Sequence, residues 1–331
     1  MERRRLGRTQ VEVSVLGLGC GPLGGLYDVL DENVATATVA AALDAGITYF
    51  DTAPLYGHGL SEHRLGTGLR RVRDGAVIST KVGRLLRPAR GEAAAGMFRD
   101  ALPFEPVYDY TREGVLRSVE DSLQRLGTDR VDILYIHDVS RRWLGEAVEA
   151  RFAEVMDGGY PALAGLRDAG VVGAIGVGMN DTAMLTRFAA AGDFDVFMLA
   201  GRYTLLDQSG LDGLFQACAA RGISIVAAGP FNSGLLATGA REGAKFFYAD
   251  APAEILDRTR RIEAISADHD VPLATAALQF ALRHPIVASV ATGMVSPEEV
   301  ARNAAALAAP VPAGLWSDLE AAGLLHPETP A

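Results

Sequence analysis

The chain has 331 residues, of which 49% are hydrophobic and 22% charged, and 31 Lys and Arg against 41 Asp and Glu give a formal net charge of −10. These values are typical of a globular protein, and no apolar run approaches the ~20 residues of a membrane-spanning helix, so we expect no membrane partner. The acidic balance opposes nucleic-acid binding, because phosphate contacts need clustered basic side chains and the best cluster is Arg3 to Arg5. Two cysteines, Cys20 and Cys218, are too few for a disulfide framework, so we expect two buried thiols in a cytoplasmic protein. The sequence does not predict the oligomeric state.

Short apolar runs alternate with amphipathic segments along almost the whole chain. Eight runs are predicted as strands: 13–19, 48–52, 77–82, 131–138, 171–177, 196–200, 223–228 and 286–292. Helical spacing follows them in segments that include 33–45, 112–126, 181–191, 211–221 and 297–307. Several of these segments end in a glycine that would close a helix in the left-handed conformation, namely Gly46, Gly127, Gly170, Gly192 and Gly222.

Continuously apolar strands that alternate with helices are typical of a parallel sheet covered by helices. Eight such units predict an α/β fold, a closed (β/α)8 TIM barrel that forms a single domain over residues 1–331. The competing fold is an open doubly wound sheet. It would normally carry the motif G-x-G-x-x-G after its first strand, whereas Gly17-Leu18-Gly19-Cys20-Gly21 lacks the third glycine.

Polar side chains stand at the carboxyl ends of the predicted strands, where the loops of a barrel form one mouth. Asp51, Lys81 and His137 end apolar runs, and Tyr56 lies on the loop after Asp51. A phenol with a pKa of about 10 needs a stabilised phenolate to exchange protons near neutrality, and an ammonium about 4 Å away would lower that pKa by about three units. We therefore expect Lys81 to stabilise the Tyr56 phenolate, Asp51 to compensate Lys81, and His137 to orient a substrate oxygen.

Each of these residues also has an ordinary structural explanation when it is considered alone. Asp51 could cap a strand end, Tyr56 could pack, and His137 could be a structural histidine. Lys81 is harder to explain in this way, since a lysine at the end of a buried strand is costly unless it is paired. Their convergence on one rim with complementary charges favours a catalytic site.

These residues belong to a wider resemblance that covers nearly the whole chain. Segments 50–57, 79–82, 118–127, 136–137 and 229–236 resemble the aldo-keto reductase family. The resemblance implies a barrel that binds a nicotinamide cofactor and a catalytic tetrad of Asp51, Tyr56, Lys81 and His137. Segments 19–25, 108–110 and 200–206 are most similar to a branch that oxidises D-threo-aldoses such as L-fucose with NAD, and to pyridoxal 4-dehydrogenases. Both activities convert a cyclic hemiacetal into a lactone.

The resemblance also implies a nucleotide site along the later strand ends. The residues expected to form it are Gly21, Asn180, Pro230, Phe231, Asn232, Gly234, Leu235, Gly293, Met294, Ser296, Glu299 and Asn303. Segment 230–234 is expected to wrap the pyrophosphate. Three positions depart from the common family pattern: Ala200 replaces a glutamine, Ala228 replaces the aromatic that stacks on nicotinamide, and Asn180 lies one place later than usual.

Cofactor choice depends on the residues after the eighth predicted strand. Enzymes of the family that use NADP carry Lys or Arg there for the 2′-phosphate, whereas this chain carries Gly293 and Glu299. A carboxylate would repel that phosphate and accept hydrogen bonds from a free ribose diol, so we expect NAD. Arg302 could reach a phosphate, which leaves NADP as the alternative cofactor.

Segment 84–110 is the longest stretch outside the strand and helix pattern, and we expect it to be a substrate loop. Its aromatic side chains, together with Trp143, could pack on a sugar or pyridine ring or could bury one another; these are Phe98, Phe104, Tyr108 and Tyr110. Tyr56, His137 and Trp143 are the expected substrate contacts.

The predicted function is hydride transfer from the anomeric carbon of an aldose to NAD, with a small molecule as substrate. The alternatives are a pyridoxal 4-dehydrogenase, a general aldehyde reductase that uses NADPH, and a non-catalytic subunit that binds a nucleotide. The complete tetrad argues against the last of these. No metal-ligand cluster is apparent in the sequence, which makes a metal-dependent barrel hydrolase a remote alternative.

Overall fold

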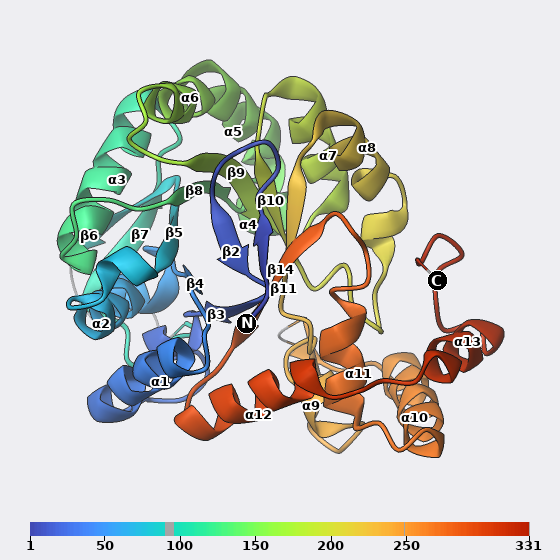
Figure 1. Ribbon diagram of the computed structural model, residues 1–331. Coiled ribbons are helices and arrows are strands. Elements are labelled where there is room, and N and C mark those ends of the chain that lie inside the picture. The colour runs from blue at the N-terminus through green and yellow to red at the C-terminus, as the bar shows by residue number, and fades with distance from the viewer. Residues whose placement is uncertain (90–95, 248, 331) are drawn as a thin grey trace.

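The computed structural model describes residues 1–89, 96–247 and 249–330. Eight parallel strands close into a barrel in the order β3, β4, β5, β8, β9, β10, β11 and β14, and helices surround it (Figure 1). The strands are β3 (Leu16–Gly19), β4 (Tyr49–Asp51), β5 (Val77–Val82), β8 (Ile133–His137), β9 (Ala174–Met179), β10 (Val196–Ala200), β11 (Ser224–Ala228) and β14 (Val287–Gly293). The predicted (β/α)8 barrel is confirmed.

The helices follow the strands along the chain. They are α1 (Glu32–Asp44), α2 (Leu60–Leu69), α3 (Arg112–Leu126), α4 (Arg141–Leu144), α5 (Val148–Glu154), α6 (Tyr160–Asp168), α7 (Thr182–Ala191), α8 (Leu214–Arg221), α9 (Leu235–Thr238), α10 (Ala253–Asp268), α11 (Leu273–Phe280), α12 (Pro297–Ala308) and α13 (Ala313–Ala321). Several of these helices begin at a side-chain cap, in which a short polar side chain accepts a hydrogen bond from the first free backbone N–H groups. Asp31 caps α1, Thr111 caps α3 and Asp181 caps α7 in this way.

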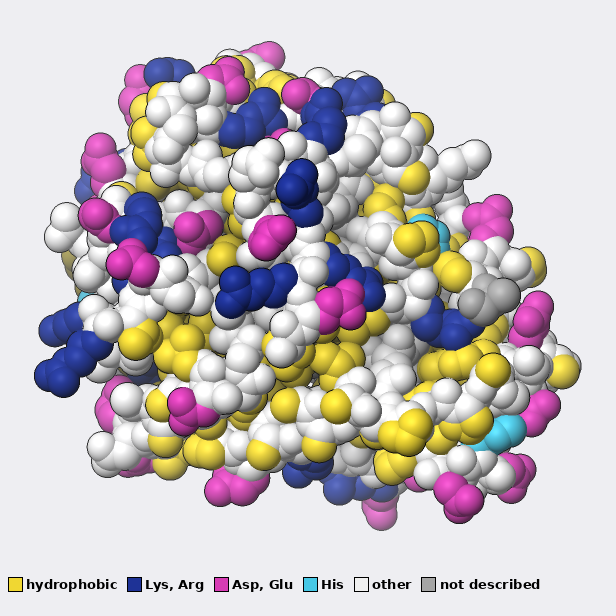
Figure 2. Space-filling view, in the orientation of Figure 1, with side chains coloured by type: hydrophobic (Ala, Val, Ile, Leu, Met, Phe, Trp, Pro, Cys, Tyr) yellow, Lys and Arg dark blue, Asp and Glu magenta, His cyan; other side chains and the backbone are white. Residues whose placement is uncertain are grey.

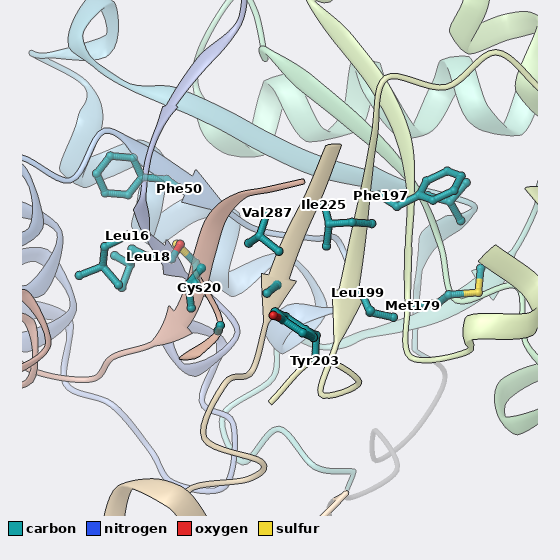
Figure 3. Close-up of a cluster of buried hydrophobic side chains, with 14 of the residues drawn as sticks. Leu16, Leu18, Cys20, Phe50, Met179, Phe197, Leu199, Tyr203, Ile225 and Val287 are labelled. Atoms are coloured by element: carbon teal, nitrogen blue, oxygen red, sulfur yellow. The ribbon is translucent and has the colours of Figure 1, made fainter. Parts of the chain in front are cut away.

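Two apolar layers hold the barrel together. Side chains that point outward from the strands, such as Leu16, Phe197 and Ile225, pack beneath the surrounding helices (Figure 3). Inward-pointing side chains, among them Tyr49 and Tyr135, fill the interior of the barrel. Cys20 and Cys218 are buried free thiols, as predicted.

The N-terminal residues depart from the predicted first strand. The run 13–19 breaks at Val15: β1 (Arg3–Arg5) and β2 (Glu12–Ser14) form an antiparallel hairpin, and the barrel strand begins only at Leu16. Leu6 and Val13 of this hairpin are fully buried against the inner layer of the barrel. The hairpin therefore plugs the barrel end opposite the mouth.

Two further local predictions are wrong. The run 171–177 is displaced toward the C-terminus, since β9 starts at Ala174 and Val171 is 54% exposed in a turn. Gly192 has an extended backbone with φ −138°, whereas the other predicted cap glycines, Gly46, Gly127, Gly170 and Gly222, have φ values of 79°, 61°, 71° and 67°.

The predicted substrate loop contains regular structure. Its ends pair as an antiparallel ribbon of β6 (Arg84–Pro88) and β7 (Phe104–Tyr108). Its residues 90–95 lie outside the described part of the chain. A second small ribbon, β12 (Lys245–Phe246) and β13 (Ala249–Asp250), precedes α10.

The surface carries both signs of charge. On the face shown in Figure 2, Lys and Arg side chains lie among Asp and Glu side chains, with apolar areas between them. Within the described residues, none of the helices combines the length and apolar character needed to cross a bilayer.

Helix α2 packs so closely on α3 that Gly66 has no room for a side chain. A Cβ added there would overlap the carbonyl oxygen of Leu126, which is backbone and cannot rotate away. We expect Gly66→Ala to lower the free energy of unfolding by about 1–3 kcal/mol in urea titrations. Gly165→Ala is the matched control: its helical position is open, so alanine should be neutral or stabilise by up to about 1 kcal/mol. Equal stabilities of the two variants would contradict this packing.

Candidate active site

A buried ion pair joins the ends of β4 and β5. Lys81 Nζ lies 2.6 Å from Asp51 Oδ2 and 2.8 Å from the carbonyl oxygen of Thr52. The two side chains are only 2% and 4% exposed, so the pair is withdrawn from solvent. Ser79 donates to the other carboxylate oxygen of Asp51 at 2.6 Å. Both charges are therefore compensated where water cannot reach them.

The barrel interior supports this pair with a chain of hydroxyl groups. The Ser79 hydroxyl lies 3.1 Å from the Tyr49 hydroxyl, which lies 3.3 Å from the Tyr135 hydroxyl. These three residues are fully buried. Because a satisfied buried network is rigid, Asp51 is held in one orientation relative to Lys81.

Tyr56 stands over the ion pair on a tight turn after β4. The turn Tyr56–Gly59 contains three residues with positive φ, Gly57, His58 and Gly59. An added Cβ at Gly24 would overlap the Tyr56 backbone, so a glycine is needed for the neighbouring loop to approach it. Lys81 Nζ lies 4.6 Å from the centroid of the Tyr56 ring. The turn thus brings the phenol into the same compartment as the ion pair.

His137, the last residue of β8, completes the group. Its ring centroid is 6.0 Å from that of Tyr56, and the two rings meet edge to face at 88°. The structure therefore brings Asp51, Tyr56, Lys81 and His137 together at the carboxyl end of the barrel, although they come from three separate segments of the chain.

The expected direction of the Tyr56 pKa shift is wrong for the protein without cofactor. Desolvation raises the pKa of the Tyr56 phenol well above its ordinary value; Asp51 and Asp138 add to the rise, and Arg84 opposes it. The physical reason is the ion pair itself. With Asp51 only 2.6 Å from Lys81, the carboxylate cancels most of the field that the ammonium would exert on the phenol.

The pKa values of the two other buried groups also depart from ordinary ones. Burial raises the pKa of Asp51, while Lys81 and Ser79 oppose that rise. Burial lowers the pKa of His137 well below its ordinary value, and Arg84 and Lys81 act in the same direction. The His137 imidazole is therefore neutral near pH 7, and it can donate from one ring nitrogen only.

A second buried ion pair adjoins His137, and the sequence prediction missed it. Arg84 Nη2 lies 3.0 Å from Asp138 Oδ2, and the same oxygen lies 3.3 Å from His137 Nε2. The sequence feature that could have indicated this pair is the position of its two residues: Asp138 follows His137 directly, and Arg84 comes soon after β5. The path of the ribbon that carries Arg84 back over the mouth was not predictable from that spacing.

The aromatic residues of the predicted substrate loop divide into two groups. Phe98 lies near the Tyr56 ring, with centroids 6.1 Å apart, and Tyr108 and Trp143 flank the Arg84 guanidinium at 4.9 and 5.5 Å. Tyr110 is fully buried and donates to the His137 carbonyl at 2.7 Å, so it supports the strand end.

The segment expected to wrap a pyrophosphate has an unusual backbone. Asn232, Ser233 and Gly234 all have positive φ, at 45°, 59° and 91°. Asn232 Nδ2 donates to the Gly201 carbonyl at 3.3 Å, while its buried Oδ1 has no hydrogen-bond partner among the described residues. Successive turn residues of this kind form concave sites for anions.

A cavity of about 500 Å³ adjoins that segment. Its lining includes Gly234, Leu235, Arg241 and Lys245. Glu242 lines the same cavity, and Lys245 pairs with Asp250, so Arg241 and the backbone N–H groups of the turn are the cavity's main contacts for an anion. Pro230 and Phe231 begin the same segment, and Gly21 lies beside the Tyr56 ring, where an added Cβ would be 3.9 Å from it.

The remaining residues expected to bind the nucleotide have clear structural contacts. Met294 is fully buried, Asn303 Nδ2 lies 3.5 Å from the Thr292 hydroxyl, and a Cβ at Gly293 would crowd Pro22. Ser296 caps α12 by accepting from the Glu299 backbone, and the Glu299 carboxylate accepts from the Val295 backbone and lies 3.4 Å from Arg302 Nη2. The Asn180 carbonyl accepts from Arg202 at 3.0 Å.

The model of the aldo/keto reductase family matches residues 15–323. The chain belongs to the aldo/keto reductase family.

Among the described residues, no three His, Cys, Asp or Glu lie together as a metal ion would require.

Two relatives are similar over almost their whole length. A pyridoxal 4-dehydrogenase from Microbacterium luteolum is 42% identical, with 98% of each chain covered, and a D-threo-aldose 1-dehydrogenase from a Pseudomonas species is 43% identical, with 95% of each covered. Among solved structures, the holo form of an aldo-keto reductase from Bacillus halodurans superposes with a TM-score of 0.77 at 27% identity, covering 98% of this chain and 97% of that one.

The ion pair at the barrel end is testable through stability. Lys81→Met leaves the Asp51 carboxylate buried without a cationic partner, and we expect it to lower the free energy of unfolding by about 3–5 kcal/mol. In the double variant Asp51→Asn/Lys81→Met neither charge remains, so its loss should be well below the sum of the two single losses. Urea titrations of all four proteins measure this coupling. Additive losses, within about 0.5 kcal/mol, would mean that the two groups do not interact.

Proposed function

We propose that this protein is an NAD-dependent aldose dehydrogenase, which oxidises the anomeric carbon of an aldose of the L-fucose or D-threo-aldose type to a lactone. The observation that carries the proposal is the group of Tyr56 and His137 around the buried Asp51–Lys81 pair. The 43% identity to a D-threo-aldose 1-dehydrogenase supports the substrate class.

In this proposal the cyclic sugar loses a proton from its anomeric hydroxyl and a hydride from the same carbon. The Tyr56 phenolate oxygen takes the proton. The neutral His137 imidazole donates a hydrogen bond to the anomeric oxygen and keeps it in line with Tyr56. Bound NAD would supply the hydride acceptor at its nicotinamide ring. Lys81, 4.6 Å from the centroid of the ring, offsets part of the cost of the buried phenolate, and Asp51 compensates and orients Lys81.

The residues proposed to hold NAD are those around the cavity beside β11. Segment 230–235 with Arg241 and Lys245 would bind the pyrophosphate, and Asn180 would face the nicotinamide end. Glu299 would accept from the ribose diol. Arg302 is the residue that could favour NADP by binding its 2′-phosphate. Its guanidinium lies 3.4 Å from the Glu299 carboxylate, which leaves it less available to that phosphate.

Pyridoxal oxidation is the second candidate. It uses the same chemistry on a cyclic hemiacetal, and a pyridoxal 4-dehydrogenase is 42% identical to this chain. Phe98 near Tyr56 and Trp143 beside Arg84 offer rings on which a pyridine could stack.

A substrate screen distinguishes these functions. With NAD, we expect turnover of L-fucose, D-arabinose or L-galactose at a kcat/KM above that of D-glucose and pyridoxal, followed through nicotinamide absorbance. We also expect NAD to exceed NADP in kcat/KM by more than about tenfold, or 1.4 kcal/mol. Preference for pyridoxal would favour the second candidate, preference for NADP would defeat the Glu299 argument, and nucleotide binding without any turnover would indicate a non-catalytic subunit.

The proton-transfer role of Tyr56 has its own test. Tyr56→Phe should lower kcat by about 10²–10⁴-fold, because a positioned acid or base contributes that much. Tyr160→Phe, a tyrosine on the outer helix α6, is the control and should leave kcat unchanged. A Tyr56→Phe enzyme within tenfold of wild type would refute the role.

The raised pKa of Tyr56 also predicts the pH dependence. A group with a raised pKa stays protonated to higher pH, and sugar oxidation needs the deprotonated form. The rate of oxidation should therefore rise with pH through the neutral range, by about tenfold per unit, while aldehyde reduction should not rise. Stopped-flow rates in both directions measure this. An oxidation rate that falls as the pH rises would contradict the sign.

A further inference from the structure

The Arg84–Asp138 ion pair has no part in the proton and hydride transfers proposed above. Arg84 is 3% exposed and Asp138 8%, and their side chains meet at 3.0 Å. Removing two charges from water is costly, so a pair buried beside reacting groups calls for a further explanation. The pair lies at the mouth of the barrel, not in its supporting interior.

The backbone conformation of Asp138 places its carboxylate on the same side as His137, facing the active site. Asp138 has a left-handed conformation with φ 55°, and its N–H donates to the Gly178 carbonyl on the next strand at 3.0 Å. Its Oδ2 then lies 3.3 Å from His137 Nε2, although the two residues are adjacent in the chain and would point apart on a regular strand. Arg84, flanked by Tyr108 and Trp143, fixes this oxygen from the other side.

The two facing atoms have complementary hydrogen-bonding capacity. A carboxylate only accepts, and a carboxylate beside Nε2 favours the tautomer in which Nε2 carries the proton. The two atoms lie 3.3 Å apart but do not form a hydrogen bond with each other, so the Nε2 proton stays available and the site presents one donor and one acceptor. Oxygens on neighbouring carbons of a sugar are separated by roughly 3 Å, about one hydrogen-bond length. A carboxylate has about four acceptor positions, so Asp138 keeps capacity for a substrate hydroxyl beside its contact with Arg84.

We propose that Asp138 is a specificity-determining residue, which accepts a hydrogen bond from the hydroxyl on C2 of the aldose while His137 donates to the oxygen on C1. Arg84 is a positioning residue, which holds the Asp138 carboxylate at the required place. This inference rests on the proposed aldose dehydrogenase function and narrows it to sugars with a hydroxyl next to the anomeric carbon. Pyridoxal has a ring carbon without a hydroxyl at that position.

The test compares L-fucose with 2-deoxy-L-fucose, using NAD and the full-length enzyme. The wild type should prefer L-fucose in kcat/KM by more than about thirtyfold, the worth of a hydrogen bond to a charged group. Asp138→Asn keeps the shape, and Asn tolerates the left-handed backbone, so the variant should fold. It should prefer L-fucose by less than about threefold, through loss of activity on L-fucose alone.

Variants of neighbouring residues provide the controls. Glu146→Gln changes an exposed carboxylate in the segment after β8 and should leave the preference unchanged. Arg84→Met should reduce the preference as Asp138→Asn does, and Arg84→Lys, which keeps the charge, should restore part of it.

Two results would overturn the inference while leaving the proposed function intact. One is a wild type that oxidises L-fucose and its 2-deoxy analogue with less than about threefold difference. The other is an Asp138→Asn enzyme that loses activity equally on both sugars, which would mean that Asp138 acts only through His137. A protein that oxidises no aldose at all would refute the proposed function itself, and the inference with it.

Discussion

The arrangement of the active-site side chains depends on one interaction, the buried ion pair between Asp51 and Lys81. The Lys81 ammonium is only 2% exposed, and the carboxylate 2.6 Å away compensates its charge; that carboxylate is held in turn by Ser79 and the hydroxyl chain beneath it. The pair also limits what Lys81 can do. Because its charge is largely cancelled by Asp51, burial decides the acidity of Tyr56, and the phenol stays protonated before substrate and cofactor bind.

The barrel fold makes this pair possible at low cost. Adjacent strands β4 and β5 place Asp51 opposite Ser79, and their carboxyl ends open into one mouth formed by all eight loops. The plug at the other end, formed by Leu6 and Val13, excludes water from below. In the proposed mechanism this rigidity is useful, because proton transfer from a sugar hydroxyl requires Tyr56 and His137 to keep fixed positions.

Much of this architecture could be predicted from the sequence, for identifiable reasons. Mostly apolar runs with polar or charged residues near their carboxyl ends, as at Asp51, Lys81 and His137, indicate both a parallel strand and a barrel mouth. What the sequence could not predict depends on chain paths and charge balance. The contact of Arg84 with Asp138 needs the turn of β6 and β7 over the mouth and a left-handed residue at 138. The rise in the Tyr56 pKa needs the distance between Asp51 and Lys81, which spacing alone does not contain.

The most direct measurement is a titration of Tyr56 by tyrosinate absorbance, taken as the difference between the wild type and Tyr56→Phe without cofactor. Our account predicts ionisation above the ordinary value of about 10. It further predicts that Asp51→Asn, which leaves the Lys81 charge uncompensated, shifts this ionisation to lower pH. Ionisation of Tyr56 near neutrality in the wild type, or the same midpoint in Asp51→Asn, would contradict the claim that the ion pair governs the acidity of the phenol.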